Sequence, residues 1–287
     1  MMRVEILKGD GKSKISQLIF DNLGLPYNTT RKIIRNKDVK VNGKRVAEDL
    51  VLKSADELMV YYQEYQKPSI NIVYQDENIV IVFKTRNVET VAETGQTLQT
   101  LISEQLGTEC YAVHRLDRNT EGLVVFALNA KSKAELDKAF KNRTIDKYYL
   151  ALANGLFKNK EEVISAYLKK DAKKSVVYIS NTMSVGFEKI ITQYKVIGEY
   201  ENSSLVEVKL ITGKTHQIRA HLAHIGHFVI GDEKYGDSKI NKQHKKRYQC
   251  LCAYKLKFNF DESSVLNYLN NRVIELEKEK IDFCQNL

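Results

Sequence analysis

The N-terminal quarter of the chain shows two kinds of hydrophobic spacing. Apolar residues recur at helical spacing over residues 12–23, which predicts an amphipathic helix. A second helix is expected over residues 29–35, with Thr29 as its N-cap. Residues 39–46 then alternate around an Asn-Gly pair, the pattern of a β-hairpin with a type I′ turn. A strand over residues 57–62 completes a small unit of helices and strands.

The longer remainder of the chain is dominated by strand patterns. A continuous apolar run, Leu123–Leu128, is typical of a strand buried on both faces. Further strands are predicted at residues 70–74, 79–83, 143–155, 205–211 and 251–258, and helices at 98–106, 131–140 and 216–225. The expected fold class is α+β, with a mostly antiparallel mixed sheet around a central cleft.

Polar segments divide the chain into three parts. Residues 63–68 are polar, end in a proline and predict a linker. We therefore expect an N-terminal module of residues 1–66 and a main domain of residues 67–262. The tail, residues 263–287, is predicted to be an amphipathic helix that packs on the main domain. The basic run 239–247 is predicted to be a solvated loop.

Composition narrows the class of protein. Lys and Arg number 45 against 36 Asp and Glu, so the net charge is +9 and the pI about 9.1, which favours a polyanionic partner. None of the 4 cysteines forms a C-x-x-C pair, which argues against a structural zinc site and for reduced thiols. No apolar run approaches the ~20 residues that span a bilayer. We expect a soluble, cytoplasmic monomer that does not bind membranes.

The loop before the buried strand contains the main candidate for chemistry. It reads HRLDRNTEGL, and its carboxylate, Asp117, lies between the guanidinium groups of Arg115 and Arg118. A neighbouring guanidinium favours the ionised form of an enclosed carboxylate, and a rigid element holds such a group accurately. The simpler interpretation is a solvated ion pair that contributes about 0–1 kcal/mol.

This loop resembles the signature of the RluA-type pseudouridine synthases, usually H-R-L-D-x-x-T-S-G-L, with Glu121 where Ser is usual. The resemblance implies that Asp117 is catalytic. The segment from Arg143 resembles the family's K-x-Y-L-A-x-x-x-G strand, which implies that Tyr149 is the active-site tyrosine. Residue type alone would equally allow a packing role for it. Because side chains alternate along a strand, Tyr148 is expected on the opposite face.

Later segments also match the family pattern. Residues 212–236 resemble T-G-R-x-H-Q-I-R…G-D-x-x-Y-G, which implies that Arg219 pairs with the catalytic aspartate. Residues 251–258 resemble L-H-A-x-x-L-x-F, with Cys252 in place of His. The family's K-P-x-G turn corresponds to residues 84–87, which lack both Pro and Gly, so no role is assigned to Lys84.

The resemblance implies conversion of uridine in RNA to pseudouridine, with ribosomal RNA favoured over transfer RNA as the substrate. The uridine is flipped out of its stack, and Arg115 corresponds to the residue that fills the vacated space. Asp117 acts at the sugar, Tyr149 stacks on the freed uracil, and Arg219 orients Asp117. His114 and His216 are expected to contact RNA near the cleft. The reaction needs no cofactor or metal.

The N-terminal pattern resembles the RNA-binding module named after ribosomal protein S-four, including its V-x-V-N-G-K hairpin. Such a module positions the enzyme through phosphate contacts. The resemblance implies phosphate contacts from basic side chains of the second helix and the hairpin, namely Arg31, Lys32, Arg35, Lys40, Lys44 and Arg45. The alternative is that these side chains only form a solvated surface.

Three other interpretations stay open on the sequence. His216, His221, His224 and His227 resemble a metal cluster, although no H-E-x-x-H motif occurs. A non-catalytic RNA-binding or ribosome-assembly factor would use the same cleft but would not need an ion-paired carboxylate. A glycoside-type hydrolase would need a second carboxylate that the sequence does not identify.

Overall fold

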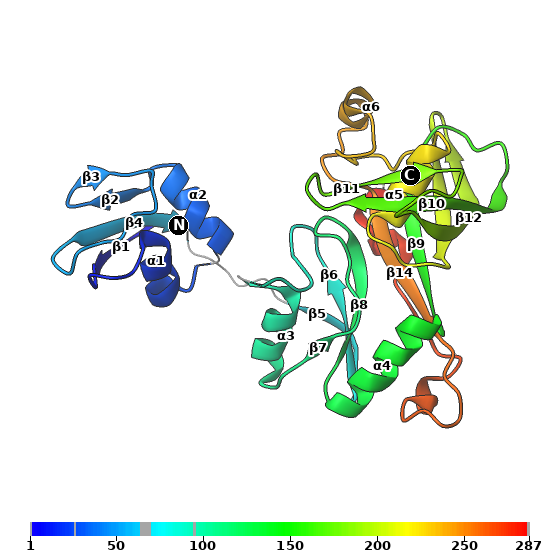
Figure 1. The fold of residues 1–287 in the computed structure, drawn as a ribbon, viewed down its shortest axis with the longest axis horizontal. Helices are drawn as coiled ribbons and strands as arrows, with labels where there is room; N and C mark the ends of the chain where they lie inside the picture. Colours follow the sequence, from blue (N-terminus) through cyan, green and yellow to red (C-terminus); the bar gives the residue numbers. More distant parts are fainter. Residues whose placement is uncertain (1, 26, 64–69, 94–95, 286–287) are drawn as a thin grey trace. The chain divides into compact units, whose positions relative to one another are not determined.

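The computed structural model describes residues 2–25, 27–63, 70–93 and 96–285. The chain divides into two compact units, Met1–Ser69 with Ala92–Thr97, and Ile70–Val91 with Leu98–Leu287. The predicted linker lies almost entirely outside the described residues, and its first residue, Gln63, ends a strand. Figure 1 shows the helices and strands of each unit.

The N-terminal unit has a four-stranded sheet, in the order β1-β4-β2-β3, and two helices. Its elements are β1 (Met2–Lys8), α1 (Ile15–Leu23), α2 (Tyr27–Arg35), β2 (Val39–Val41), β3 (Lys44–Arg45) and β4 (Glu57–Gln63). Strand β1 was not predicted from the sequence, and it pairs with β4 along its whole length. Buried side chains of both helices and of β2 and β4 form the core of this unit.

Two local predictions for this unit have different outcomes. Asn42 and Gly43 both have positive φ angles, 49° and 79°, as a type I′ hairpin turn requires, so the hairpin prediction is confirmed. Thr29 as an N-cap is wrong, because α2 begins at Tyr27 and Thr29 lies within the helix. Several polar residues that are able to cap a helix follow one another here, and residue type alone does not choose among them.

The second unit is built on a mixed sheet that has eleven strands within the described part of the chain. Its main path runs β11-β10-β12-β13-β9-β14-β8-β6-β5, while β15 pairs with β14 and β7 with β8. Only the β14–β8 pairing is parallel among the described strands. The strands are β5 (Asn71–Gln75), β6 (Ile79–Lys84), β7 (Tyr111–Ala112), β8 (Glu121–Ala127), β9 (Ile145–Asn154), β10 (Glu161–Asp171), β11 (Val176–Ser180), β12 (Glu188–Tyr200), β13 (Ser203–Leu210), β14 (Leu251–Phe258) and β15 (Val273–Glu275). This confirms the predicted α+β class with a mostly antiparallel sheet.

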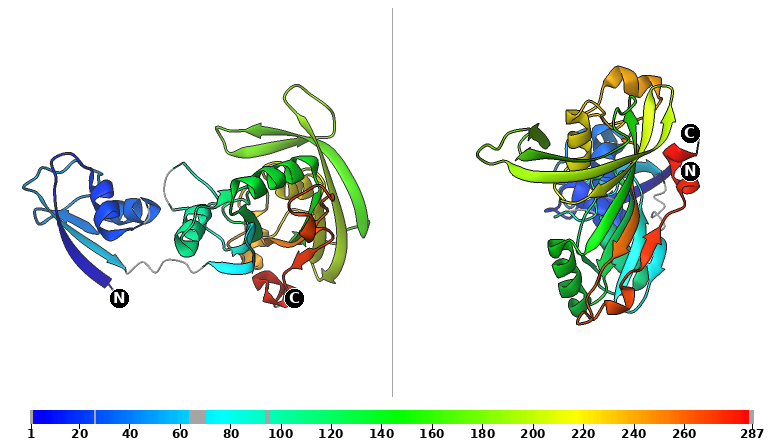
Figure 2. Two further views of the ribbon diagram at one scale, coloured as in Figure 1. Left: turned by 90° about the horizontal axis from the view of Figure 1, so that it is seen from below. Right: turned by 90° about the vertical axis from the view of Figure 1, so that its right-hand side faces the viewer.

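Helices and short turns cover both faces of this sheet. The helices are α3 (Leu98–Leu106), α4 (Ala130–Asn142), α5 (Gln217–His224) and α6 (Ser238–Gln243), and the 3₁₀ turns are η1 (Asn267–Leu269), η2 (Lys278–Lys280) and η3 (Asp282–Cys284). Side chains of α3 and α5 pack in one core cluster, and those of η3 pack in another with the opposite side chains of β9 and β14. Figure 2 shows α5 and the C-terminal segment on opposite sides of the sheet.

Strand β8 passes through the middle of the core and leads back to the signature loop. All seven of its residues are buried, as the apolar run predicted. Val124 and Phe126 belong to the cluster with α3 and α5, whereas Leu123 and Val125 belong to the cluster with α4. The loop before β8 is therefore attached to one of the most enclosed strands of the unit.

Two predictions for the C-terminal third are wrong. The basic run 239–247 is not only a loop, because α6 (Ser238–Gln243) covers its first half. The Asp237 side chain caps this helix by accepting hydrogen bonds from the backbone amides of Lys239 and Ile240. The tail after Glu262 does not form an amphipathic α-helix. It forms short 3₁₀ turns and β15, which completes the hydrogen bonding of β14. Apolar spacing alone did not reveal this pairing, because it depends on packing against another strand of the sheet.

Candidate active site

A cleft of about 1190 Å³ opens beside the signature loop. Most of its lining comes from four segments of the second unit: the loop before β8, the first half of β9, the turn between β13 and α5, and the loop that follows α5. Asp117, Tyr149, His216 and Arg219 all contribute to this lining. Thus the structure brings together the residues that the sequence patterns selected separately.

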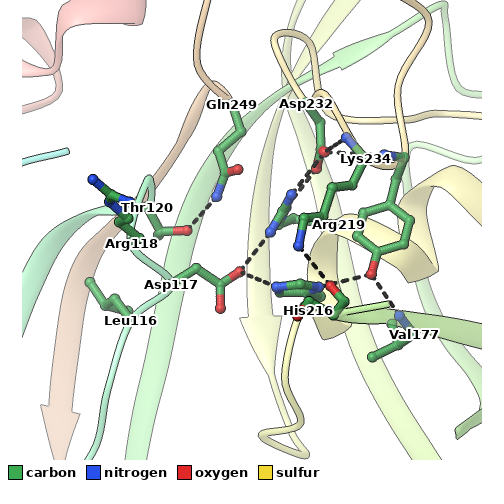
Figure 3. A network of polar contacts seen from close by, with 12 residues as sticks. Leu116, Asp117, Arg118, Thr120, Val177, His216, Arg219, Asp232, Lys234 and Gln249 are labelled. Atoms are coloured by element: carbon green, nitrogen blue, oxygen red, sulfur yellow. Dashed lines mark hydrogen bonds and ion pairs between the residues drawn. The ribbon is translucent and has the colours of Figure 1, made fainter. Parts of the chain in front are cut away.

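The Asp117 carboxylate lies at the centre of the polar network in this cleft (Figure 3). Its side chain is 24% exposed, and Oδ2 accepts a hydrogen bond of 2.9 Å from Nη1 of Arg219. Nε2 of His216 lies 3.7 Å from the same oxygen. Oδ1 points away from both groups in Figure 3. One oxygen is thus held by the protein while the other is directed into the cleft.

Arg219 is itself held in place by Asp232. Its Nε and Nη2 donate hydrogen bonds of 2.6 and 2.9 Å to the two carboxylate oxygens of Asp232, a bidentate arrangement. Burial alone would lower the pKa of Arg219, but Asp232 and then Asp117 raise it above its usual value. The guanidinium is therefore a permanent cation. Asp232 stands in the G-D-x-x-Y-G segment, and that motif was the signal that would have found it.

Lys84 connects the signature loop to the turn after β6 through hydrogen bonds to backbone carbonyl groups of both. It is fully buried, and its ammonium group donates to three carbonyl oxygens, those of Thr85, Val88 and Arg118, at 2.9–3.0 Å. Burial lowers the pKa of Lys84 to about 8. The sequence motif predicted no role for Lys84, because the turn after it lacks the usual Pro and Gly. The structure shows Asn87 with a φ of 65°, in the left-handed conformation that glycine would adopt.

Side chains from other segments hold the two ends of the loop. Thr90 Oγ1 accepts a hydrogen bond from the Leu116 amide at 3.3 Å, and Gln249 donates to Thr120 Oγ1 at 2.7 Å. Gly122 allows the loop to enter β8 close to β14, since a Cβ there would lie 2.2 Å from the carbonyl oxygen of Ala253. Together these contacts make the backbone around Asp117 rigid.

The adjacent tyrosines of β9 lie on opposite faces of the sheet, as the alternation predicted. Tyr149 lines the cleft, and its side chain packs in the core cluster that includes Leu116. Tyr148 faces the other side, where Nζ of Lys255 lies 4.8 Å from the centre of its ring. Burial, followed by the charge of Asp117, raises the pKa of Tyr149 well above its usual value. The phenol therefore keeps its proton.

The two histidines expected to contact RNA have protein partners. The His114 ring stacks on Phe140, with ring centres 4.5 Å apart, and its Nε2 accepts a hydrogen bond from the Val125 amide. Burial lowers the pKa of His114 to about 3. His216 Nδ1 lies 2.8 Å from the Tyr235 hydroxyl. RNA contacts by either ring stay a prediction.

Arg115 differs from the buried members of this loop. Its side chain is 62% exposed, and Nη2 lies 3.7 Å from a carboxylate oxygen of Glu89 at the rim of the cleft. An exposed ion pair of this length contributes little to stability. The guanidinium is therefore accessible at the entrance, where the predicted contact to RNA would need it.

Glu121 has a specific partner that the sequence did not reveal. It is 6% exposed and accepts a hydrogen bond of 2.8 Å from Nη2 of Arg86. Nη1 of Arg86 in turn donates to Asp282 in the C-terminal segment at 3.1 Å. Glu121 therefore links the end of the signature loop to the turn after β6 and to η3.

The histidine cluster does not form a metal site in the part of the chain that the structure describes. His221 Nδ1 lies 3.0 Å from Thr192 Oγ1, and His227 Nδ1 lies 2.9 Å from the carbonyl oxygen of Asn154. These two rings have structural partners on different strands.

Comparison with known proteins agrees with this geometry. A family model described as RNA pseudouridylate synthase matches residues 65–224. The chain belongs to this family. It is 30% identical over 260 residues to an uncharacterized RNA pseudouridine synthase of Bacillus subtilis (strain 168), an alignment that covers 82% of this chain and 85% of the relative. It is also 30% identical over 239 residues to ribosomal large subunit pseudouridine synthase C of Vibrio vulnificus (strain CMCP6), covering 76% and 74% of the two chains.

A solved structure supports the fold of this pseudouridylate synthase. Human RNA Pseudouridylate Synthase Domain Containing 1 superposes with a TM-score of 0.63 at 24% identity, over 76% of this chain and 90% of the human one. The predicted class of enzyme, an RNA pseudouridine synthase, is confirmed by the family and by the relatives. In the described residues, no helix is both long and apolar enough to cross a membrane.

Proposed function

We propose that this enzyme isomerises uridines in structured ribosomal RNA and that Asp117 is the catalytic residue. The arrangement of Asp117, Arg219 and Asp232 is the observation that carries the proposal, because it holds an ion-paired carboxylate in a cleft that is large enough for a nucleotide. The name of the Vibrio relative, a ribosomal large subunit pseudouridine synthase, supports ribosomal over transfer RNA.

The charges of the cleft suit an RNA substrate. Basic residues line the cleft, among them Arg118, Arg143, Lys147, Lys170 and Arg247. Phosphate contacts of this kind supply affinity without reading sequence. A uridine that is flipped out of its stack places its sugar near Asp117, at a cost of a few kcal/mol. Arg115, at the rim, then fills the space that the base has left.

The reaction requires that the bond from N1 of uracil to the anomeric carbon breaks and that a bond from carbon 5 forms. Oδ1 of Asp117 either attacks the anomeric carbon or removes a ribose proton, while Arg219 keeps Oδ2 in place. Carbon 5 loses a proton after the new bond forms, and N1 gains one. The protein supplies positioning and a fixed anion, and no cofactor enters this scheme.

Tyr149 serves in this proposal as the platform for the uracil ring. An aromatic side chain that stacks on a base contributes about 1–3 kcal/mol, enough to retain the uracil while it turns. Because burial keeps the phenol protonated, Tyr149 is suited to stacking and to donating a hydrogen bond. A tyrosinate that removes the proton from carbon 5 is disfavoured by the same burial.

The first test separates chemistry from binding. Asp117→Asn removes the charge and keeps the shape, so a transcript of large-subunit ribosomal RNA should bind within about threefold of the unaltered affinity while pseudouridine formation is lost. Asp137→Asn, in the exposed pair with Lys133, is the matched control and should retain activity. Continued turnover by Asp117→Asn would exclude that residue from the mechanism.

The second test identifies the RNA. Ribosomal and transfer RNA from a strain that lacks the gene are mapped for missing pseudouridines, and a plasmid copy of the gene should restore them, whereas a copy carrying Asp117→Asn should not. Pseudouridines that are missing from the ribosomal RNA of the deletion strain would support the proposal. Missing sites confined to transfer RNA would correct the substrate and leave the enzyme class intact.

We further propose that residues 1–66 form an S-four-like RNA-binding module, that residues 67–262 form the catalytic domain, and that the enzyme acts as a monomer. The exposed side chains of Arg31, Lys32 and Arg35 lie on α2, and Lys44 and Arg45 lie on the β2–β3 hairpin with Lys40 beside them. Lys40 Nζ also lies 5.4 Å from the centre of the Tyr61 ring. Basic groups on one helix and one hairpin suit the backbone of folded RNA.

The salt dependence of binding tests the module in the full chain. Replacing Arg31, Lys32 and Arg35 by Gln should weaken binding and reduce the slope of log K against log salt by roughly 0.7–0.9 for each phosphate that the variant no longer neutralises. The matched control replaces Lys131, Lys138 and Lys141, which are exposed on α4. Equal slopes for the two triple variants would contradict a specific role for the module.

A further inference from the structure

His216 occupies a backbone conformation that non-glycine residues rarely adopt. Its φ is 54°, in the left-handed region, directly before α5. Non-glycine residues in this region are held there by their surroundings and are common at functional sites. The side chain is 12% exposed, and its two ring nitrogens face different partners, Tyr235 and Asp117. This backbone conformation therefore places the imidazole between a phenol and the proposed catalytic carboxylate.

The hydrogen bonds of Tyr235 indicate which ring nitrogen carries the proton. The backbone amide of Val177 donates to the Tyr235 hydroxyl oxygen at 2.8 Å (Figure 3). With that oxygen already accepting, its own proton is free to point at Nδ1 of His216, 2.8 Å away. A neutral imidazole that accepts at Nδ1 has its proton on Nε2. The opposite tautomer would direct the Nε2 lone pair at the Asp117 anion.

Tyr235 also contacts the other partner of Asp117. Its ring centre lies 5.3 Å from the guanidinium carbon of Arg219, and its backbone amide donates to Asp232 at 3.1 Å. The groups that face the His216 imidazole are Asp117 from the signature loop, Arg219 from α5, and Asp232, Lys234 and Tyr235 from the segment after α5. Burial lowers the pKa of His216 although Asp117 opposes this, so the ring is neutral near pH 7.

We propose that Tyr235 is a positioning residue that fixes His216 in the Nε2-protonated tautomer, so that the carboxylate of Asp117 has a neutral hydrogen-bond donor beside the guanidinium of Arg219. The proposal rests on the proposed role of Asp117. The distance of 3.7 Å from Nε2 to Oδ2 exceeds a hydrogen bond, and the proposal requires a small rotation of either side chain that shortens it when the enzyme acts. A neutral donor orients the carboxylate without reducing its basicity, whereas a second cation would reduce it.

The first test reads the tautomer directly and does not depend on activity. The full-length protein is labelled with ¹⁵N-histidine, and the His216 signals are assigned by their loss in His216→Gln. We expect Nε2 to be protonated and Nδ1 unprotonated in the unaltered protein, and a mixture of both tautomers in Tyr235→Phe. Tyr178→Phe, an exposed position on β11, should leave the signals unchanged. An Nδ1-protonated ring, or an unchanged tautomer in Tyr235→Phe, would overturn the proposal.

The second test uses two replacements of His216 that differ in reach. Asn suits the left-handed backbone, but its amide extends only as far as Nδ1. Gln extends to the position of Nε2 and retains a donor toward Asp117. We expect kcat to fall about tenfold in His216→Asn, the contribution of one hydrogen bond to a charged group, with KM within about twofold, and His216→Gln to recover most of the loss. Equal activity of the two variants would contradict the proposed donor.

The two tests keep this inference separate from the proposed function. If Asp117→Asn still forms pseudouridine, the catalytic role of Asp117 fails, whereas the tautomer of His216 is read from the spectra in either case. If Asp117→Asn is inactive and His216→Asn is fully active, only the positioning role fails.

Discussion

Arg219 and Asp232 form a bidentate ion pair, with Nε to Oδ2 at 2.6 Å and Nη2 to Oδ1 at 2.9 Å, which leaves Nη1 of Arg219 for Asp117. Asp232 is fully buried, and Arg219 is 5% exposed. The orientation of the guanidinium therefore depends on Asp232. Asp232 thus positions the carboxylate of Asp117 indirectly, through Arg219.

Asp232→Asn should destabilise the protein strongly. The change leaves the buried Arg219 without its bidentate partner, and breaking a buried ion pair in this way costs about 3–5 kcal/mol. Urea denaturation measures the loss in the free energy of unfolding. Asp137→Asn, which removes the exposed partner of Lys133, is the control and should change it by less than about 0.5 kcal/mol. A change of similar size in both variants would show that the Asp232 pair is not specifically stabilising.

Glu121 and Arg86 should show a measurable coupling energy. Replacing Glu121 by Ser, the residue usual in the family motif, leaves the partly buried Arg86 with only Asp282, and we expect a loss of about 1–3 kcal/mol. A double-mutant cycle with Arg86→Met should give a coupling of at least about 0.5 kcal/mol, because the two side chains share a direct contact. Additive effects of the two changes would mean that the pair contributes nothing.

His114 should make stability depend on pH. Its pKa is lowered from the usual 6.5 to about 3, chiefly by burial and then by Lys147, so the folded protein binds the proton less readily than the unfolded chain. The stabilisation is therefore complete above about pH 6.5 and is lost as the pH falls toward 3. Burial also lowers the pKa of His216 and of His221, so part of the pH dependence belongs to them. Between pH 7 and pH 5 we expect the loss in the free energy of unfolding to be about 1–2 kcal/mol smaller in His114→Gln than in the unaltered protein.

The control for this pH effect is His224→Gln, which alters a histidine at the end of α5 that is more accessible than His114. This variant should keep the full pH dependence of the unaltered protein. The assignment to His114 would be wrong if His114→Gln retained the same slope between pH 5 and 7.

Asn87 should be replaceable by Gly but not by Ala. Its φ of 65° lies in the left-handed region, where a Cβ costs about 1–2 kcal/mol, and the short polar side chain of Asn reduces that cost. Thermal denaturation should place Asn87→Gly within about 0.5 kcal/mol of the unaltered protein, whereas Asn87→Ala should lose about 1 kcal/mol. An Ala variant as stable as the Gly variant would show that the turn changes its conformation.

Local patterns in the sequence were sufficient to predict most of the helices and strands that surround the cleft. The apolar run of β8 was recognisable because every side chain of a strand between two covered faces is buried. Alternation placed Tyr149 and Tyr148 on opposite faces, and the Asn-Gly pair indicated the hairpin turn. These features depend on how side chains alternate along a strand and on the residues of a single turn. Both can be read from residues that are neighbours in the sequence.

The sequence alone did not determine the contacts that orient the signature loop. Arg219 contacts Asp117, which is 102 positions away in the sequence, and Gln249 contacts Thr120, which is 129 positions away. Hydrophobic periodicity relates only residues that are close in the sequence, so it does not predict such contacts. Motif resemblance named Arg219, and the G-D-x-x-Y-G motif contains Asp232, but only the tertiary structure shows that these two residues pair and that the Lys84 amine is buried against three carbonyl groups. Tertiary packing decides these contacts, because burying an unpaired charge or hydrogen-bond donor is costly, and the partners available to it depend on how the sheet and helices pack. For the same reason, the C-terminal tail formed β15 against β14 instead of the helix that its own spacing allowed.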